Sequence, residues 1–170
     1  MAAGLTYVPI ATTTVGSATS IVTFTSISQT YTDLVLIANG SITANGYAMQ
    51  VRVGSSNTID TGNNYSMNRL IWYPTGSPYA VESPNISFYT FDGTSYSSGS
   101  SNVGISNFMS YSNTTTYKTM LNRSGYASDQ SMVSAAVWQN TAAINTIQVY
   151  VASGNINAGS TFTLYGIADA

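Results

Sequence analysis

The sequence predicts an all-β protein: a single antiparallel β-sandwich, jelly-roll-like in topology, that spans residues 1–170. Short segments with apolar residues at every second position recur along the chain, and stretches rich in Gly, Asn, Ser and Pro separate them. No segment shows helical periodicity over a useful length. The hydrophobic fraction is 44%, the chain is long enough for one core, and no shift in composition marks a domain boundary.

Four strands are expected in the first third of the chain. The first, at residues 5–10, lies within a Thr- and Ala-rich segment, 1–20, which is either an arm that reaches a neighbouring molecule or a plain edge strand. Residues 21–25 and 47–53 alternate between apolar and polar side chains. Residues 33–39 form an apolar run, which is typical of a strand buried on both faces.

The middle of the chain predicts five further strands. They are expected at residues 68–73, 86–91, 103–111, 117–123 and 131–138. Pro, Gly and Ser are frequent between residues 74 and 101, around the strand expected at 86–91. This part is therefore interpreted as a long excursion between strands.

Two strands complete the expected sandwich. Residues 144–151 are the longest strand candidate, with Ile147, Val149 and Val151 on one face, and residues 161–167 also alternate. Residues 141–143 are expected to form one helical turn ahead of the first of these strands.

Charged residues are rare: four are Lys or Arg and six are Asp or Glu, which is 6% of the chain. A soluble domain normally carries about 25%, so Ser, Thr, Asn, Gly and Tyr are expected to form most of the surface. The four cations are scattered, which argues against nucleic-acid binding. No apolar run approaches the roughly 18 residues of a membrane helix, and the N-terminus lacks the features of a signal peptide.

The same composition argues against catalysis. The chain contains no histidine and no cysteine, which excludes a Ser-His-acid triad and disulfide bonds. Lys118, the only lysine, is expected to point to solvent from a strand. The six carboxylates are interpreted as isolated loop acids and not as a hydrolytic pair: Asp33, Asp60, Glu82, Asp92, Asp129 and Asp169. No enzymatic activity and no cofactor are expected.

One segment, residues 60–64, has oxygen donors at Asp60 and Asn64 on either side of Gly62. Calcium accepts such ligands, but the segment lacks the spacing and the terminal Glu of an EF-hand. A tight Asx-type turn is the interpretation that the sequence favours.

Tyrosine is the positive signal, because the chain contains 13 of them. Tyrosine combines rigid apolar area with a polar tip, which suits protein interfaces and sugar faces; the alternative is that tyrosines line sheet edges because strands favour aromatic residues. Of the two tryptophans, Trp138 is expected in the core and Trp72 near a loop. The predicted interface residues are Tyr65, Trp72, Tyr73, Tyr79, Tyr89, Tyr96, Tyr111, Tyr117 and Tyr126.

Several segments resemble the small structural proteins of tailed-phage virions, cyanophages among them. They are YVPIA at residues 7–11, SQTYTDLVL at 28–36, TGNNYS at 61–66, NTTTYKT at 113–119, INTI at 144–147 and GSTFTLYGI at 159–167. The resemblance covers almost the whole chain and its motifs are structural. It implies a β-sandwich that sits on the capsid as a decoration (cement) protein, or on the tail or a fibre. No binding residue is carried over from it.

The resulting expectation is a virion protein of the outer capsid surface, assembled in the host cytoplasm. Its expected partners are the major capsid protein and copies of itself, in an oligomer such as a trimer. The alternative is a host-recognition module of the tail or a fibre, which would bind surface glycan through loop tyrosines and Trp72.

Overall fold

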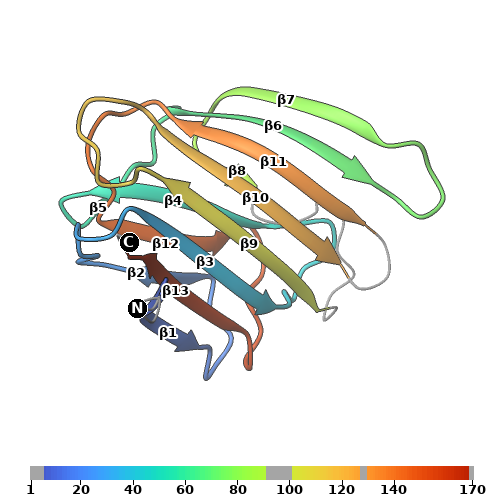
Figure 1. Cartoon of the computed structure of the whole chain (residues 1–170). Helices are drawn as coiled ribbons and strands as arrows, with labels where there is room; N and C mark the ends of the chain where they lie inside the picture. The colour runs from blue at the N-terminus through green and yellow to red at the C-terminus, as the bar shows by residue number, and fades with distance from the viewer. Residues whose placement is uncertain (1–5, 91–100, 127–129, 169–170) are drawn as a thin grey trace.

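The computed structural model describes residues 6–90, 101–126 and 130–168, and within these ranges the chain forms thirteen strands and no helix (Figure 1). The strands build two antiparallel sheets that pack against each other. The predicted antiparallel β-sandwich is therefore confirmed. The jelly-roll topology is not confirmed, since a jelly roll divides eight strands between two sheets, whereas one sheet here contains eight by itself.

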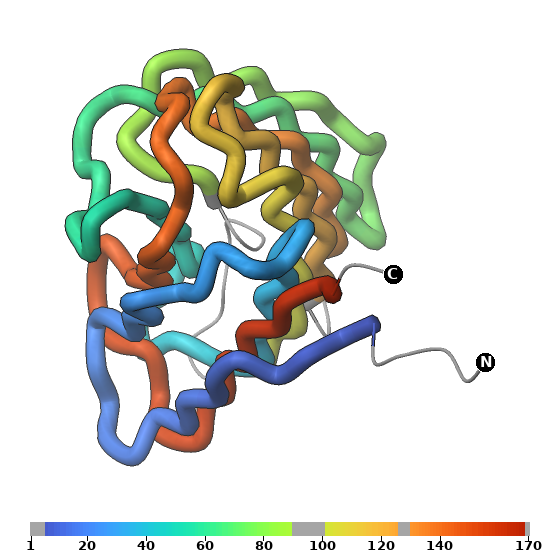
Figure 2. Tube along the Cα trace, turned by 60° about the vertical axis from the view of Figure 1, so that its left-hand side comes forward, coloured from blue at the N-terminus to red at the C-terminus, as the bar shows by residue number. Residues whose placement is uncertain are grey.

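The larger sheet runs from one side of the molecule to the other in Figure 1. Its spatial order is β1 (Tyr7–Thr14), β13 (Thr161–Ile167), β3 (Asp33–Gly40), β9 (Asn102–Met109), β10 (Lys118–Tyr126), β11 (Ser131–Trp138), β6 (Tyr65–Trp72) and β7 (Tyr79–Ile86). Figure 2 shows the first and last strands of the chain, β1 and β13, side by side. Segments far apart in sequence thus form one continuous sheet.

The smaller sheet covers the inner face of the larger one. Its order is β2 (Ile21–Phe24), β12 (Thr146–Val151), β4 (Met49–Ser55) and β5 (Thr58–Ile59), and β8 (Tyr89–Thr90) also pairs with β4. Alternate residues of the two sheets meet between them and form one core, to which Leu36, Val51 and Phe162 belong. Trp138 is 1% exposed in this core, as its sequence context predicts.

Most of the predicted strands are present, with boundary differences that have local causes. The strands expected at residues 131–138 and 161–167 match β11 and β13. The prediction that residues 144–151 form the longest strand is wrong. Ile144 and Asn145 donate their backbone N–H groups to Tyr111 and Gly54, so β12 begins only at Thr146. Residues 141–143 form no helical turn.

The interpretation of residues 74–101 as an excursion is wrong for its first part. Tyr79–Ile86 forms β7, an eight-residue edge strand paired with β6. Pro84 hides this strand in the sequence, because proline is excluded from central strands but tolerated at an edge. The short strand β5 is also absent from the sequence prediction, and residues 91–100 lie outside the described residues.

The N-terminal segment forms the edge-strand alternative over Tyr7–Thr14, which pairs with β13. Residues 1–5 lie outside the described residues. Within the described ranges, no helix has the length and hydropathy needed to cross a membrane.

Candidate contact surface

The prediction of an interface role is wrong for three tyrosines, because each side chain is completely buried: Tyr65, Tyr89 and Tyr111. Their hydroxyl groups find partners inside the protein. The Tyr65 hydroxyl lies 2.9 Å from the Val53 carbonyl oxygen and accepts the Val53 N–H at 3.0 Å. Such partners let a phenol sit in a core, and the alternation of a strand does not distinguish this position from an exposed one.

The other two buried phenols make similar contacts. The Tyr89 hydroxyl lies 3.0 Å from Ser106 Oγ, and the Tyr111 hydroxyl donates to the Ser28 carbonyl. Burial raises the pKa of all three tyrosines above the ordinary value of 10.0. These residues join the sheets and loops of one chain together.

The remaining predicted residues do not gather on one surface. Tyr73 and Tyr79 flank the β6–β7 turn and stack with ring centroids 5.9 Å apart, and Trp72 is exposed nearby. Tyr117 is exposed at the opposite end of the larger sheet. It precedes Lys118, which begins β10 and pairs with Trp138, the last residue of β11. Tyr96 lies outside the described residues, and so does the side chain of Tyr126, although its backbone belongs to β10.

The outer face of the larger sheet carries an apolar surface that the sequence prediction missed. Ten large apolar side chains are exposed in the described part of the chain, and five of them project from this face over β6, β9, β10 and β11. We name these five the outer-face patch: Trp72 on β6, Val103 and Met109 on β9, Leu121 on β10 and Val133 on β11. A signal for it exists in the sequence of β11, where apolar residues occupy both faces of the strand.

The register places two of these side chains, Val133 and Leu121, in adjacent rows across neighbouring strands. One row runs Ile105, Arg123, Val133 and Leu70, and the next runs Asn107, Leu121, Ala135 and Asn68. A shallow depression of about 290 Å³ lies between Leu121, Arg123 and Val133. Strands β9, β10, β11 and β6 therefore carry an apolar centre at Leu121, Val133 and Leu70, with polar positions such as Asn107 and Asn68 beside it.

Few charges interrupt this face within the described residues. Arg123 on β10 and Glu82 on β7 are exposed there. Asp33 lies at its end, where its carboxylate accepts the Ser110 N–H at 2.6 Å. A solvated face of an antiparallel sheet normally carries polar side chains, and large exposed apolar patches mark interaction surfaces.

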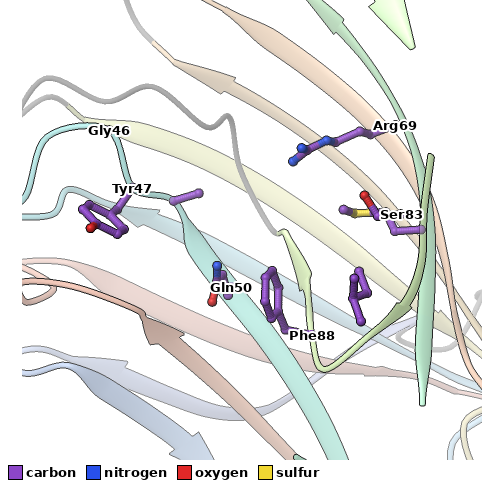
Figure 3. Close-up of a pocket in the computed structure, with 9 residues that line it drawn as sticks. Gly46, Tyr47, Gln50, Arg69, Ser83 and Phe88 are labelled. Carbon is purple, nitrogen blue, oxygen red and sulfur yellow. The ribbon is translucent and has the colours of Figure 1, made fainter. Parts of the chain in front are cut away.

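A second feature is a pocket of about 230 Å³ between β4 and β8 on one side and β6 and β7 on the other. Arg69 extends from β6 into this space, and Tyr47, Gln50 and Phe88 lie across from it (Figure 3). Burial lowers the pKa of Arg69 below its ordinary value. Aromatic rings beside an amide and a guanidinium are a set that can contact a sugar.

The Asp60 segment has the geometry of the Asx-type turn. The Asp60 carboxylate accepts hydrogen bonds from the Gly62 N–H at 2.8 Å, from the Asn64 amide at 2.9 Å and from the Trp138 indole Nε1 at 2.8 Å. Burial works against the charged form, but these donors lower the pKa of Asp60 below 3.8. Its oxygens face N–H donors, which is an arrangement for anchoring a loop and not for coordinating a cation.

Lys118 does not point to solvent, and that prediction is wrong. Its side chain is 0% exposed, and Nζ donates to the carbonyl oxygens of Thr116 at 2.7 Å and Thr141 at 3.0 Å. Lys118 shares the inward side of β10 with Met120, which directs it into the molecule. Burial lowers the pKa of Lys118 from 10.5.

Comparison with protein-family models finds no match for this chain, and comparison with curated proteins finds none either. Inference about function therefore depends on the chain's own surfaces. The outer-face patch and the pocket beside Arg69 are the two candidates that its geometry presents.

Proposed function

We propose that this chain is a structural protein of a phage virion, a decoration (cement) protein that stabilises the head through protein–protein contacts. The outer-face patch is the observation that carries the proposal, because a sheet face with exposed apolar side chains and few charges suits contact with another protein. The resemblance of the sequence motifs to small virion proteins supports the same assignment.

The composition of the face suits a stabilising contact. Its apolar side chains and hydroxyl groups interact over short distances, so salt screens these contacts less than it screens exposed ion pairs. A cement protein is present in many copies, and the contacts of all copies add together over the shell. Modest affinity at each copy is therefore sufficient for this role.

The proposal assigns no catalytic step to the chain. The sequence offers no histidine or cysteine as nucleophile or base. Asp60 anchors its loop through three donors, and Asp33 is bonded to a backbone N–H. Both carboxylates have structural partners, and neither needs a role in acid–base chemistry.

The test compares particles assembled with wild-type protein and with two variants. Leu121→Lys places a charge in the outer-face patch, and Ile21→Lys places the same charge on β2, in the smaller sheet. The two positions are matched, since each side chain is 46% exposed. We expect Leu121→Lys to reduce the number of copies per purified particle at least tenfold and Ile21→Lys to leave it unchanged.

Equal occupancy for both variants would overturn the assignment of this face. The wild-type copy number and labelling of intact particles would locate the protein on the head or on the tail. A location on the tail would overturn the cement role.

A host-recognition module that binds glycan is the second candidate. The pocket beside Arg69 favours it, together with the stacked rings of Tyr73 and Tyr79 at the β6–β7 turn. Binding to a glycan array, lost in Tyr47→Ala and retained in Tyr117→Ala, would support this candidate. Tyr117 is the control because it is exposed at the other end of the larger sheet.

A further inference from the structure

We propose that the outer face binds a second copy of this chain, face to face, across β10, β11, β6 and β7. The pair would be related by a two-fold axis that lies in the interface between β11 and β6. This inference rests on the proposed function, because it names the partner of the same assembly surface. Three observations carry it: the protection of the sheet edges, the area of a four-strand face that holds Trp72, Leu121 and Val133, and the positions of two charges.

The edges of the sandwich are poorly suited to pairing with another chain. Edge strand β1 contains Pro9 and an irregularity in its register beside it, and edge strand β7 contains Pro84 and a register shift of its own. The outer strands of the smaller sheet, β2 and β5, have only four and two residues. Proline, bulges and short edge strands all oppose edge-to-edge association, so the sheet face is the better route.

The surface is large enough for a specific contact. Four strands at the usual spacing are about 19 Å wide, and eight residues of strand are about 26 Å long, so each copy contributes about 500 Å². The pair would then bury about 1,000 Å², which is at the lower end for specific interfaces. Val133 and Leu70, which are register neighbours on β11 and β6, would lie at the centre.

Two charges that are exposed on the described part of this face complement each other under this symmetry. Arg123 lies on β10 and Glu82 on β7, at opposite margins of the four strands. A two-fold axis midway between those strands and parallel to them places Arg123 of one copy opposite the partner's Ala80, which shares its cross-strand row. The partner's Glu82 lies in the next row, about 7 Å along the strand, where two long side chains can meet, and the reverse contact follows. Each charge therefore has an opposite charge on the second copy. A partner of unrelated sequence would not provide these opposite charges automatically.

A two-fold contact also differs from the trimer that the sequence suggested. A three-fold assembly needs two different patches that fit each other, whereas a two-fold contact uses the same patch on both copies. The outer face is one such patch.

The experiment measures the mass of the purified full-length protein by sedimentation and light scattering, from micromolar to submillimolar concentration. We expect the wild type to dimerise in this range, Val133→Lys to remain monomeric, and Ile21→Lys to dimerise like the wild type. Val133 is 44% exposed, so its replacement is compatible with folding, and circular dichroism checks this for each variant.

Charge reversal tests the symmetry itself. Arg123→Glu and Glu82→Arg should each weaken the dimer about tenfold, and the double variant should recover most of the wild-type affinity. If the losses of dimer binding free energy in the two single variants simply added in the double variant, the result would overturn the proposed axis. Because the two residues are far apart within one chain, recovery in the double variant has to come from a contact between copies.

A wild-type protein that stays monomeric throughout would overturn the dimer. If Val133→Lys then still lowered particle occupancy, the face would bind a different virion protein, and the proposed function would stand without the dimer. A dimer abolished by Val133→Lys with unchanged particle occupancy would support this inference and overturn the proposed role of the face on the particle.

Discussion

The ring of Tyr31 lies so close to Gly166 that a Cβ atom on Gly166 would stand 2.3 Å from Tyr31 Cγ. Tyr31 precedes β3 and Gly166 lies within β13, so this contact joins two segments that are distant in sequence. Both residues belong to the motifs on which the resemblance to virion proteins depends. The glycine is thus explained by packing and not by backbone conformation.

The contact predicts that Gly166→Ala destabilises the fold by about 2 kcal/mol, since added volume in a packed site forces its neighbours to move. The measurement is the free energy of unfolding from urea titration. Gly16→Ala is the matched control, because no atom lies within 4 Å of the added Cβ there. A Tyr31→Ala background should remove most of the penalty at Gly166, and an unchanged penalty would refute the steric explanation.

The bond between Asp60 and the indole of Trp138 should appear in a double-mutant cycle. We expect Asp60→Ala to cost about 2 kcal/mol, since it leaves the buried indole N–H without its charged acceptor. In a Trp138→Phe background the same change should cost about 1 kcal/mol less. Additive effects would show that the two side chains are not coupled.

Asp60 also predicts a response to acid. Its pKa is lowered in the folded state, so it contributes stability that is present above 3.8 and is lost as the pH falls through the folded-state value. Asp60→Asn should therefore show a shallower loss of stability below pH 3.8 than the wild type. Urea titrations at a series of acidic pH values measure this difference, and identical slopes would contradict it.

Alkaline pH should destabilise the protein through its buried phenols. Burial raises the pKa of Tyr65, Tyr89, Tyr111 and Tyr150 above 10.0. The unfolded chain therefore loses protons first, and stability falls as the pH rises above 10.0. Tyr89→Phe removes one of these groups and should flatten the decline. A decline of unchanged steepness in Tyr89→Phe would contradict this effect of the buried phenol.

The buried amine of Lys118 should have the opposite effect on the pH dependence of stability. Burial lowers its folded-state pKa below 10.5, so the unfolded chain binds the proton more tightly, and stability rises with pH between the lowered value and 10.5. Lys118→Met should abolish this rise and make the alkaline decline begin earlier. If stability depended on pH in the same way in Lys118→Met and in the wild type, the result would contradict a lowered pKa for the buried Lys118.

The strands themselves could be predicted because their signals are local. The alternation at residues 131–138 and 161–167, and the apolar run at 33–39, follow from which side chains a half-buried or fully buried strand can carry. The edge strand β7 could not be predicted in this way, because Pro84 is acceptable only at an edge, and edge position is a property of the assembled sheet.

The candidate surfaces show the same division. Tyr65 and Tyr79 look alike in sequence, yet Tyr65 is buried against Val53 and Tyr79 is exposed. Lys118 looks like a solvent-facing lysine until loop carbonyls from Thr116 and Thr141 surround its ammonium group. In each case the partner lies on another element, so the local pattern contains no information about it.

By itself the sequence determined that this protein is an antiparallel β-sandwich with few charges, no histidine and no cysteine, because composition and period-two alternation are properties of short segments. Only the tertiary structure decided which face of each strand meets the smaller sheet and which stays exposed. Leu121 and Val133 form one surface because β10 and β11 are register neighbours and no second layer covers their outward side in the described structure. Strand order and coverage arise from contacts between distant segments, and these exist only in the folded chain.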